Sequence, residues 1–197
     1  DAPFWALDLG MPTKVEVKRK QPPGPGFIPM GSVITYHFPA RGTKPPVVMK
    51  WYEKGYPVPV PERWEKGKKL PGGGGMYMEG TKDTLFHAGM RPNSPQLTPN
   101  ARFMEMKPEL AKIERLPKAV GGPIEEWIHA IKGGPAPGSN FDYAAALTEV
   151  VLLGALAQRS GKTIEWDPQA MKVTGQPAFD PWIKEPVRKG WEYGADL

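Results

Sequence analysis

Alternation of apolar and polar residues predicts three β-strands in the first quarter of the chain. Val15 and Val17 alternate with charged residues, which is the period of a half-buried strand, and we expect this strand to span residues 13–20. Runs of β-branched and aromatic residues predict two further strands at Ser32–Phe38 and Val47–Tyr52. Breaks rich in proline and glycine separate the three. Such short spacing favours an antiparallel meander over alternating strand–helix units.

Helical periodicity dominates the last third of the chain. An amphipathic helix is predicted at residues 124–131, where three isoleucines and a tryptophan share one face and Lys-Gly-Gly follows. The main core helix is expected at residues 143–159, closed by Gly161. A short strand is predicted at 163–166, and a short helix at 3–9 begins the chain.

The middle of the chain predicts a hairpin between two long irregular segments. Residues 75–79 and 84–87 are its strands, parted by a Gly-Thr-Lys-Asp turn. Residues 56–71 and 90–117 show no dependable periodicity, with at most one helical turn near Gln96, and loops this long usually carry function or contact a partner. Strands first and helices later indicate an α+β fold. We expect a sheet with helices packed on one face, and the length of 197 residues allows one large domain or two small ones.

Composition supports a folded, loop-rich protein. Proline and glycine together make 48 of 197 residues (25 plus 23), close to the level of low-complexity chains. The 20 aromatic residues (7 Trp, 6 Tyr and 7 Phe) and the apolar periodicity argue against disorder. The chain opens on Asp1-Ala2-Pro3 without an initiating Met or a signal peptide, and we expect that an N-terminal portion precedes it.

Charge and residue types exclude several classes of partner and chemistry. The net charge is +5, but the densest basic segments, 14–20 and 66–69, do not interleave aromatic rings with charges as a stacking platform would. We therefore expect no nucleic-acid partner. The lack of cysteine excludes disulfides, thiol catalysis and cysteine-based zinc sites. The longest apolar run, at 150–157, is too short to span a membrane, so no membrane partner is expected.

Three features invite a catalytic interpretation, and each has a simpler alternative. The glycine run at 72–75 suggests a phosphate loop, but such a loop needs a strand before it and a helix after it, and here a strand follows. None of His37, His87 and His129 makes a metal pair with another histidine, so no metal site is expected. Glu149 lies within an apolar helix, where a structural hydrogen bond is favoured over catalysis.

Aromatic residues gather in or beside the predicted sheet. These are Trp51, Tyr52, Tyr56, Trp64 and Tyr77. Exposed aromatic faces stack on the flat apolar faces of sugar rings, so these residues could bind carbohydrate. Packing in the core or at an interface is the favoured interpretation.

A family resemblance emerges at residues 121–134. Their sequence, GGPIEEWIHAIKGG, looks like the Glu-Trp-Ile-x-Ala-Ile-Lys-Gly-Gly helix end of the Gfo/Idh/MocA family of NAD(P)-dependent oxidoreductases, in the bacterial branch common in planctomycetes and Bacteroidetes. Other similar segments occur in the same order, at residues 3–7, 51–52, 79–82, 141–143, 147–154, 161–167, 171–174 and 188–191. Two positions depart from the family pattern: Asp83 stands where glycine is usual, and Pro123 where a polar residue or histidine is common.

The resemblance implies that the chain is the C-terminal domain of such an enzyme, a single domain with one large, mostly antiparallel open sheet. Members of the family pair an N-terminal Rossmann domain, which binds NAD or NADP, with a C-terminal domain built on a large antiparallel sheet. That second domain shapes the substrate site, and its open sheet face forms the oligomer interface. Members oxidise or reduce a hydroxyl of a sugar or polyol by hydride transfer. The nucleotide-binding glycines and the catalytic lysine belong to the Rossmann half, and the Asp-x-x-x-His motif would fall just before Asp1.

We therefore expect an inactive fragment that has no catalytic, cofactor-binding or metal-binding residue of its own. Its partners would be the missing Rossmann domain, further copies of the chain through the sheet face, and a sugar-like small molecule. By position and chemistry, the residues nearest the substrate would be Asp1, Trp51, Tyr52 and His87. The alternative is a non-enzymatic carbohydrate-binding or oligomerisation module. The resemblance leaves the compartment open between the cytoplasm and export through a twin-arginine leader.

Overall fold

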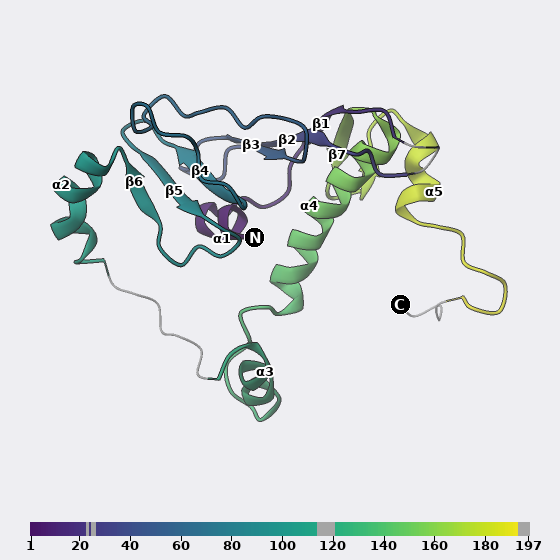
Figure 1. Ribbon diagram of the computed structural model, residues 1–197. Coiled ribbons are helices and arrows are strands. Elements are labelled where there is room, and N and C mark those ends of the chain that lie inside the picture. Colours follow the sequence, from purple (N-terminus) through teal and green to yellow (C-terminus); the bar gives the residue numbers. More distant parts are fainter. Residues whose placement is uncertain (23, 25–26, 114–120, 193–197) are drawn as a thin grey trace. The chain divides into compact units, whose positions relative to one another are not determined.

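Helices and strands occur together in both parts of the chain, which confirms the predicted α+β class. The computed structural model describes residues 1–22, 24, 27–113 and 121–192 (Figure 1). The chain divides into two units: Asp1–Pro57 with Ala136–Leu197 form the first, and Val58–Pro135 form the second. The strands are divided accordingly. A five-stranded sheet belongs to the first unit and a three-stranded sheet to the second.

The five-stranded sheet has the strand order β3-β2-β1-β7-β8, and every neighbouring pair is antiparallel. Its members are β1 (Lys14–Arg19), β2 (Ser32–Phe38), β3 (Val47–Tyr52), β7 (Ile164–Asp167) and β8 (Lys172–Val173). The first three strands form the predicted meander, with β2 and β3 at the predicted bounds. In the register, Val15 lies opposite Tyr36, and Ile34 lies opposite Trp51.

One face of this sheet forms the core of the first unit with helix α4 (Phe141–Ser160). Alternate residues of β2 are buried, as expected for a strand with one covered face. Their partners include Val150, Leu153 and Ala157 of α4. Figure 1 shows the C-terminal half of α4, drawn in green, beside β1 and β7. Helix α1 (Ala2–Leu7) joins this core through Phe4, whose ring meets Tyr143 of α4 edge-on with centroids 5.7 Å apart.

Both ends of α4 are capped. At the N-terminus, the side-chain oxygen of Asn140 accepts a hydrogen bond of 3.1 Å from the Tyr143 amide. At the C-terminus, Gly161 takes a left-handed conformation with φ 68°, as the sequence predicted for the residue that closes the helix. The Arg19 guanidinium donates to the carbonyl oxygens of Gln158 and Arg159 and so satisfies two of the last helical carbonyls.

Helix α4 is also the one helix in the described part of the chain that is long and apolar enough to cross a membrane. This holds by length and composition alone, since the helix has 20 residues. Its C-terminal half instead packs on the sheet through Leu153, Leu156 and Ala157, each less than a tenth exposed. The same composition suits the core helix of a globular unit, and that is how the C-terminal half is used here.

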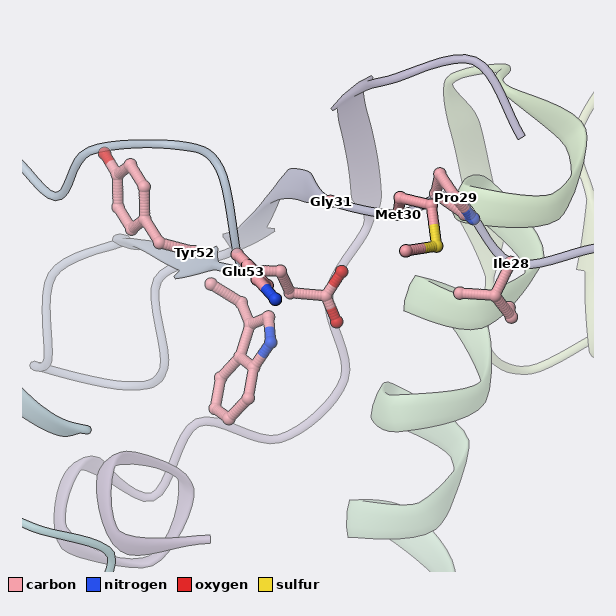
Figure 2. A pocket seen from close by; sticks show the side chains of 8 residues that line it. Ile28, Pro29, Met30, Gly31, Tyr52 and Glu53 are labelled. Atoms are coloured by element: carbon pink, nitrogen blue, oxygen red, sulfur yellow. The ribbon is translucent and has the colours of Figure 1, made fainter. Parts of the chain in front are cut away.

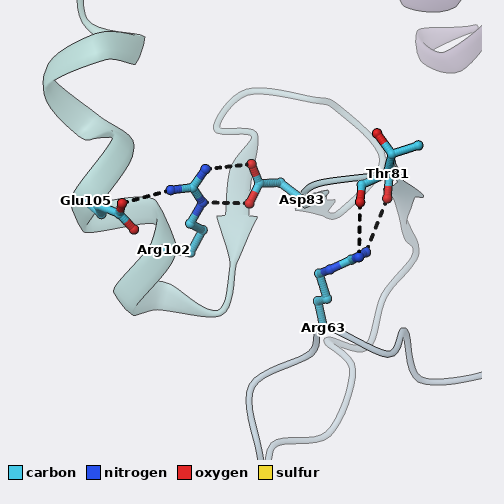
Figure 3. Close-up of polar contacts among 6 residues, drawn as sticks. Arg63, Thr81, Asp83, Arg102 and Glu105 are labelled. Carbon is cyan, nitrogen blue, oxygen red and sulfur yellow. Dashed lines mark hydrogen bonds and ion pairs between the residues drawn. The ribbon is translucent and has the colours of Figure 1, made fainter.

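The second unit contains the predicted hairpin, extended by a third strand. Strands β4 (Gly75–Glu79) and β5 (Thr84–Ala88) pair antiparallel, and β6 (Gln96–Thr98) adds to β5. The rings of Trp64 and Phe86 pack edge to face with their centroids 4.7 Å apart. Figure 3 shows the Arg63 guanidinium donating hydrogen bonds of 3.2 Å to the carbonyls of Gly80 and Thr81 in the hairpin turn.

The expectation for residues 90–117 was wrong over most of its length. The single helical turn near Gln96 is strand β6, and an unpredicted helix, α2 (Asn100–Leu110), follows it. The lack of dependable periodicity in these residues suggested a loop. Helix α2 even includes Pro108, which has no N–H to donate to the carbonyl of Met104 and lies only two residues before the end of the helix. In the first turn, the Asn100 amide donates a hydrogen bond of 2.8 Å to the Glu65 carboxylate, so one free N–H of the helix start has a partner. Residues 114–117 lie outside the described residues.

The remaining helices are α3 (Pro123–Ile131) in the second unit and two short segments near the C-terminus. Helix α3 has the predicted amphipathic pattern, but its apolar side chains are all exposed, from Ile128 at 41% to Ile124 at 71%. The C-terminal segments are the 3-10 turn η1 (Pro177–Phe179) and α5 (Asp180–Ile183). Phe179 reaches the core of the first unit, and the Arg159 guanidinium lies 5.0 Å from the centre of the Trp182 ring.

Candidate functional site

The pleat of β3 separates the two aromatic residues that the sequence placed together at a substrate site. Trp51 pairs with Ile34 on the face that α4 covers, whereas Tyr52 pairs with Val33 on the opposite face. Successive side chains of a strand point to opposite sides, so the rings of Trp51 and Tyr52 lie on opposite faces of the sheet. Both residues line one hollow at the end of β3, and Tyr52 also lines a second hollow on the open face.

The first hollow lies where β3 ends and where the chain enters β2. It is shallow, with a volume of about 470 Å³. It is lined by Ile28, Pro29, Met30, Gly31, Trp51, Tyr52, Glu53 and Lys54. Figure 2 shows the Glu53 carboxylate pointing toward the segment that carries Ile28 and Met30, while the Tyr52 ring points the other way. The indole of Trp51 is 57% exposed, so one large aromatic face is open to solvent here.

Backbone contacts hold the two walls of this hollow together. The Glu53 amide donates to the Ser32 carbonyl (2.9 Å), and the Lys20 amide donates to the Gly31 carbonyl (3.0 Å). A Cβ added at Gly31 would collide with the carbonyl oxygen of Lys54, so only glycine allows this close approach of the two chain segments. The spacing of the two chain segments in this wall is therefore set by backbone contacts.

A buried polar network orients the Glu53 carboxylate. Its Oε2 atom accepts hydrogen bonds from the Ser32 hydroxyl (2.7 Å) and from the Gln158 amide nitrogen (2.7 Å), and the same amide also donates to the Ser32 hydroxyl (2.8 Å). Ser32 is fully buried and Gln158 is only 6% exposed. Among the described residues, the other carboxylate oxygen, Oε1, accepts no hydrogen bond. Glu53 thus presents a fixed carboxylate with one acceptor atom free for a ligand.

The Glu53 charge also acts on the core beneath it. Burial raises the pKa of the Tyr36 hydroxyl to about 12, and the negative charge of Glu53 adds to this effect. Tyr36 therefore stays protonated at every physiological pH. Its hydroxyl lies against Gly154 of α4, where even a Cβ would collide with it.

The second hollow lies on the sheet face away from α4 and has a volume of about 420 Å³. Apart from Val17, which packs against the core, its lining comes from the outward positions of β1, β2 and β3 and from the chain just after β3. The lining residues are Glu16, Val17, Lys18, Val33, Thr35, Lys50, Tyr52, Tyr56 and Pro57. The Lys18 ammonium lies 5.8 Å from the centre of the Tyr56 ring. This open face thus mixes apolar, aromatic and charged groups.

Charges on the open face are partly paired. The Glu16 carboxylate lies 2.9 Å from the Lys14 ammonium and 2.7 Å from Nε2 of His37. Hydrogen bonds from Lys14 and then from His37 lower the pKa of Glu16 below its usual range. The imidazole of His37 thus has the structural role that the sequence favoured for it.

The other two predicted site residues lie elsewhere. Asp1 precedes α1, and its carboxylate accepts a hydrogen bond from the Tyr143 hydroxyl. His87 belongs to β5 of the second unit and is only 7% exposed. Of the four residues, Trp51 alone presents an exposed side chain in the first hollow. The binding roles of all four stay predictions.

Sequence reasoning missed Glu53, which lines the first hollow, and the two residues that hold its carboxylate, Ser32 and Gln158. Two signals were present. Glu53 directly follows the Trp51-Tyr52 pair, and Gln158 is a polar residue near the end of an apolar helix. The sequence did not show that Gln158 and Glu53 lie next to each other, because 105 residues separate them along the chain.

Neither the His, Asp and Glu side chains nor the glycine run forms a metal or dinucleotide site among the described residues. Among the described residues, no three His, Cys, Asp or Glu side chains come together as metal ligands. The glycine run at 72–75 leads directly into β4 rather than into a helix, so it does not fit a dinucleotide phosphate loop. This agrees with the simple turn expected from the sequence.

Comparisons with known proteins add no identification. The chain matches no protein-family model, no curated protein and no solved structure. The family resemblance described above is therefore a basis for a proposal, and the fold class is what the structure itself establishes.

Proposed function

We propose that this chain is the substrate-shaping and assembly domain of an NAD(P)-dependent oxidoreductase of the Gfo/Idh/MocA type. The enzyme would act on a hydroxyl of a sugar or polyol. A separate Rossmann domain would hold NAD or NADP and supply the hydride chemistry, and this chain would bind no cofactor. The sequence motifs at 121–134 and 161–167 suggest the family.

The observation that carries the assembly part of this proposal is the open face of the five-stranded sheet. In the described part of the first unit, α4 packs on one face, and the other face presents the outward residues of β1, β2 and β3. Val48 is 56% exposed there, with Tyr52 and Val33 on the same face. An uncovered sheet face that mixes apolar and paired charged groups suits contact with another copy of the chain.

Sedimentation of the chain over a concentration series tests this proposal. We expect reversible self-association, weakened by Val48→Lys, because the substitution replaces an exposed apolar side chain of the open face, on the edge strand β3, by a charge. Val151→Lys is a matched control, since Val151 is 60% exposed but lies on α4. A chain that stays monomeric throughout the series, or equal effects of the two substitutions, would contradict assembly through this face.

Titration with NADH and NADPH tests whether this chain lacks a cofactor site, as the proposal of a separate Rossmann domain requires. We expect no binding to the chain, because the glycine run at 72–75 does not fit a dinucleotide loop. A dissociation constant in the micromolar range would contradict the proposal.

The rival function is a non-enzymatic carbohydrate-binding module, which the exposed indole of Trp51 beside Glu53 favours. The two functions differ in ligand and affinity. A binding module would bind polymeric glycans tightly without self-associating, whereas a substrate-shaping domain would self-associate and bind single rings weakly. Glycan arrays read beside sedimentation therefore separate the two.

A further inference from the structure

The geometry points to a sugar-binding site in the hollow between Trp51 and Met30, in which Glu53 is the residue that determines specificity. We propose that one pyranose ring lies with its C–H face on the Trp51 indole and donates hydroxyl hydrogen bonds to Oε1 of Glu53. The choice of a sugar as ligand rests on the proposed function. The place where the ring binds, its orientation and the assignment of Glu53 as the specificity-determining residue rest on the residues of the hollow itself.

The first step is that the carboxylate is already positioned. Oε2 of Glu53 is held by the Ser32 hydroxyl and the Gln158 amide at 2.7 Å each, which fixes the plane of the carboxylate without occupying Oε1. A ligand therefore gains an oriented acceptor without having to order it, which reduces the entropic cost of binding. Hydrogen bonds to an ionised acceptor are also the stronger kind.

The second step is that the surrounding surface suits a ring with one apolar face. Trp51 is 57% exposed, Met30 is 70% exposed and Ile28 is 47% exposed, and all three line the same hollow as the carboxylate. A pyranose presents C–H groups on its faces and hydroxyls around its edge. The indole matches the former and Glu53 the latter.

The third step is the charge of the hollow, which distinguishes a neutral sugar from an organic cation. Lys54 lines the hollow directly after Glu53 in the chain. A lysine in the lining disfavours a cationic ligand, because like charges repel. It suits a neutral polyhydroxyl ligand, because an ammonium donates to hydroxyl oxygens as readily as the carboxylate accepts from hydroxyl hydrogens.

Amide and indole NMR shifts of the whole chain, titrated with methyl β-D-glucopyranoside, test the assignment. We expect saturable shifts at Trp51 and Glu53, with a dissociation constant on the order of millimolar, as for small ligands in shallow sites. Glu53→Gln replaces the free acceptor by a donor yet retains one oxygen for Ser32 and Gln158. Trp51→Ala removes the indole face. Each should weaken binding about tenfold or more.

Matched controls and a competing probe make the result decisive. Trp127→Ala removes an indole of nearly equal exposure (58%) in the other unit, and Glu165→Gln neutralises an exposed carboxylate on β7; both should bind the glycoside as the unsubstituted chain does. The thermal midpoint of unfolding shows whether Glu53→Gln is folded. Trp51→Ala is a second, independent variant at an exposed position.

Three results would overturn the assignment: no saturable shift, unchanged binding in both hollow variants, or tighter binding of tetramethylammonium than of the glycoside. Self-association would be unaffected by any of these results, so the assembly function is tested separately.

Discussion

The indole Nε1 of Trp166 donates a hydrogen bond of 2.8 Å to the carboxylate of Glu149. Trp166 lies on the covered face of β7 and is 5% exposed, and Glu149 lies in the middle of α4. The bond therefore connects the core helix to the fourth strand of the sheet. It also supplies the structural partner that the sequence favoured for Glu149 over a catalytic role.

This pair predicts different outcomes for two substitutions at one position. Glu149→Gln keeps a carbonyl acceptor for the indole and should change the free energy of unfolding little. Glu149→Leu leaves the Trp166 N–H unpaired next to the core, and we expect a loss of about 1–3 kcal/mol. Urea denaturation followed by tryptophan fluorescence measures both. Equal losses for the two variants would show that the hydrogen bond does not contribute.

Gly154 of α4 predicts a clash that reverses the usual preference for alanine in helices. Alanine favours a helix over glycine by about 1 kcal/mol. Here the added Cβ would collide with the hydroxyl of Tyr36, which is 5% exposed and has little room to move. We expect Gly154→Ala to lower the free energy of unfolding by about 1–3 kcal/mol.

A double-mutant cycle with Tyr36→Phe tests whether the Tyr36 hydroxyl causes the loss of stability in Gly154→Ala. Removing the hydroxyl leaves the Cβ facing the ring carbon at 3.0 Å, so we expect partial recovery of stability in the double variant. Additive effects of the two substitutions would place the strain elsewhere.

Gln158 should be important for stability because its buried amide donates to two acceptors, the fully buried Ser32 hydroxyl and the half-buried Glu53 carboxylate. Gln158→Leu removes the donor that both the Ser32 hydroxyl and Glu53 Oε2 use, and we expect a loss of about 2 kcal/mol in the free energy of unfolding. Gln169→Leu is the control, since Gln169 lies exposed on the surface and its substitution should stay within about 0.5 kcal/mol. A loss no larger than that of the control would contradict the structural importance of the network.

Asp83 of the second unit predicts an acid-dependent loss of stability. Figure 3 shows its two carboxylate oxygens accepting hydrogen bonds of 2.7 and 3.0 Å from the Arg102 guanidinium. The hydrogen bonding from Arg102 lowers the pKa of Asp83 below its ordinary value. Since the folded-state pKa is depressed, the stabilisation is present above the ordinary pKa of about 4 and is lost as the pH falls through the folded value.

The measurement is the urea midpoint at a series of pH values. We expect the unsubstituted chain to lose stability more steeply than Asp83→Asn below about pH 4, because the variant has no carboxylate to protonate. Arg102→Lys should resemble Asp83→Asn in part, since lysine cannot form the two-pronged contact. Added salt should reduce the difference, as both side chains are partly exposed. Parallel pH profiles would contradict a role for this pair.

Local patterns predicted most of the secondary structure. Strands β2 and β3 have the predicted bounds, and the hairpin, α3, α4 and β7 agree with expectation to within two residues. The failure at α2 has a physical cause. Its N-terminal amide is satisfied by Glu65, which is 35 residues away in sequence, and no local pattern contains such a contact.

The candidate site likewise combines features that the sequence predicted with features that depend on contacts between distant segments. The sequence indicated Trp51 and Tyr52 as binding residues, but the alternation of a strand places their rings on opposite faces. Glu53, the residue that we assign to ligand recognition, became a candidate only through the network with Ser32 and Gln158. Residue types indicated an aromatic component of the site, and the alternation along β3 decided that the Trp51 ring lies on the face that α4 covers and the Tyr52 ring on the open face.

By itself, then, the sequence determined where most of the strands and helices form, although not β6 and α2, because periodicity, caps and turn residues act within a few residues of one another. It also determined the mixed α+β class. The tertiary structure alone decided that the strands form sheets of five and three, that Glu149 has a structural partner, and that the Glu53 carboxylate is oriented with one oxygen free. These features depend on contacts between distant segments, such as β3 and the end of α4, and the side-chain pattern of either segment alone is compatible with many such pairings.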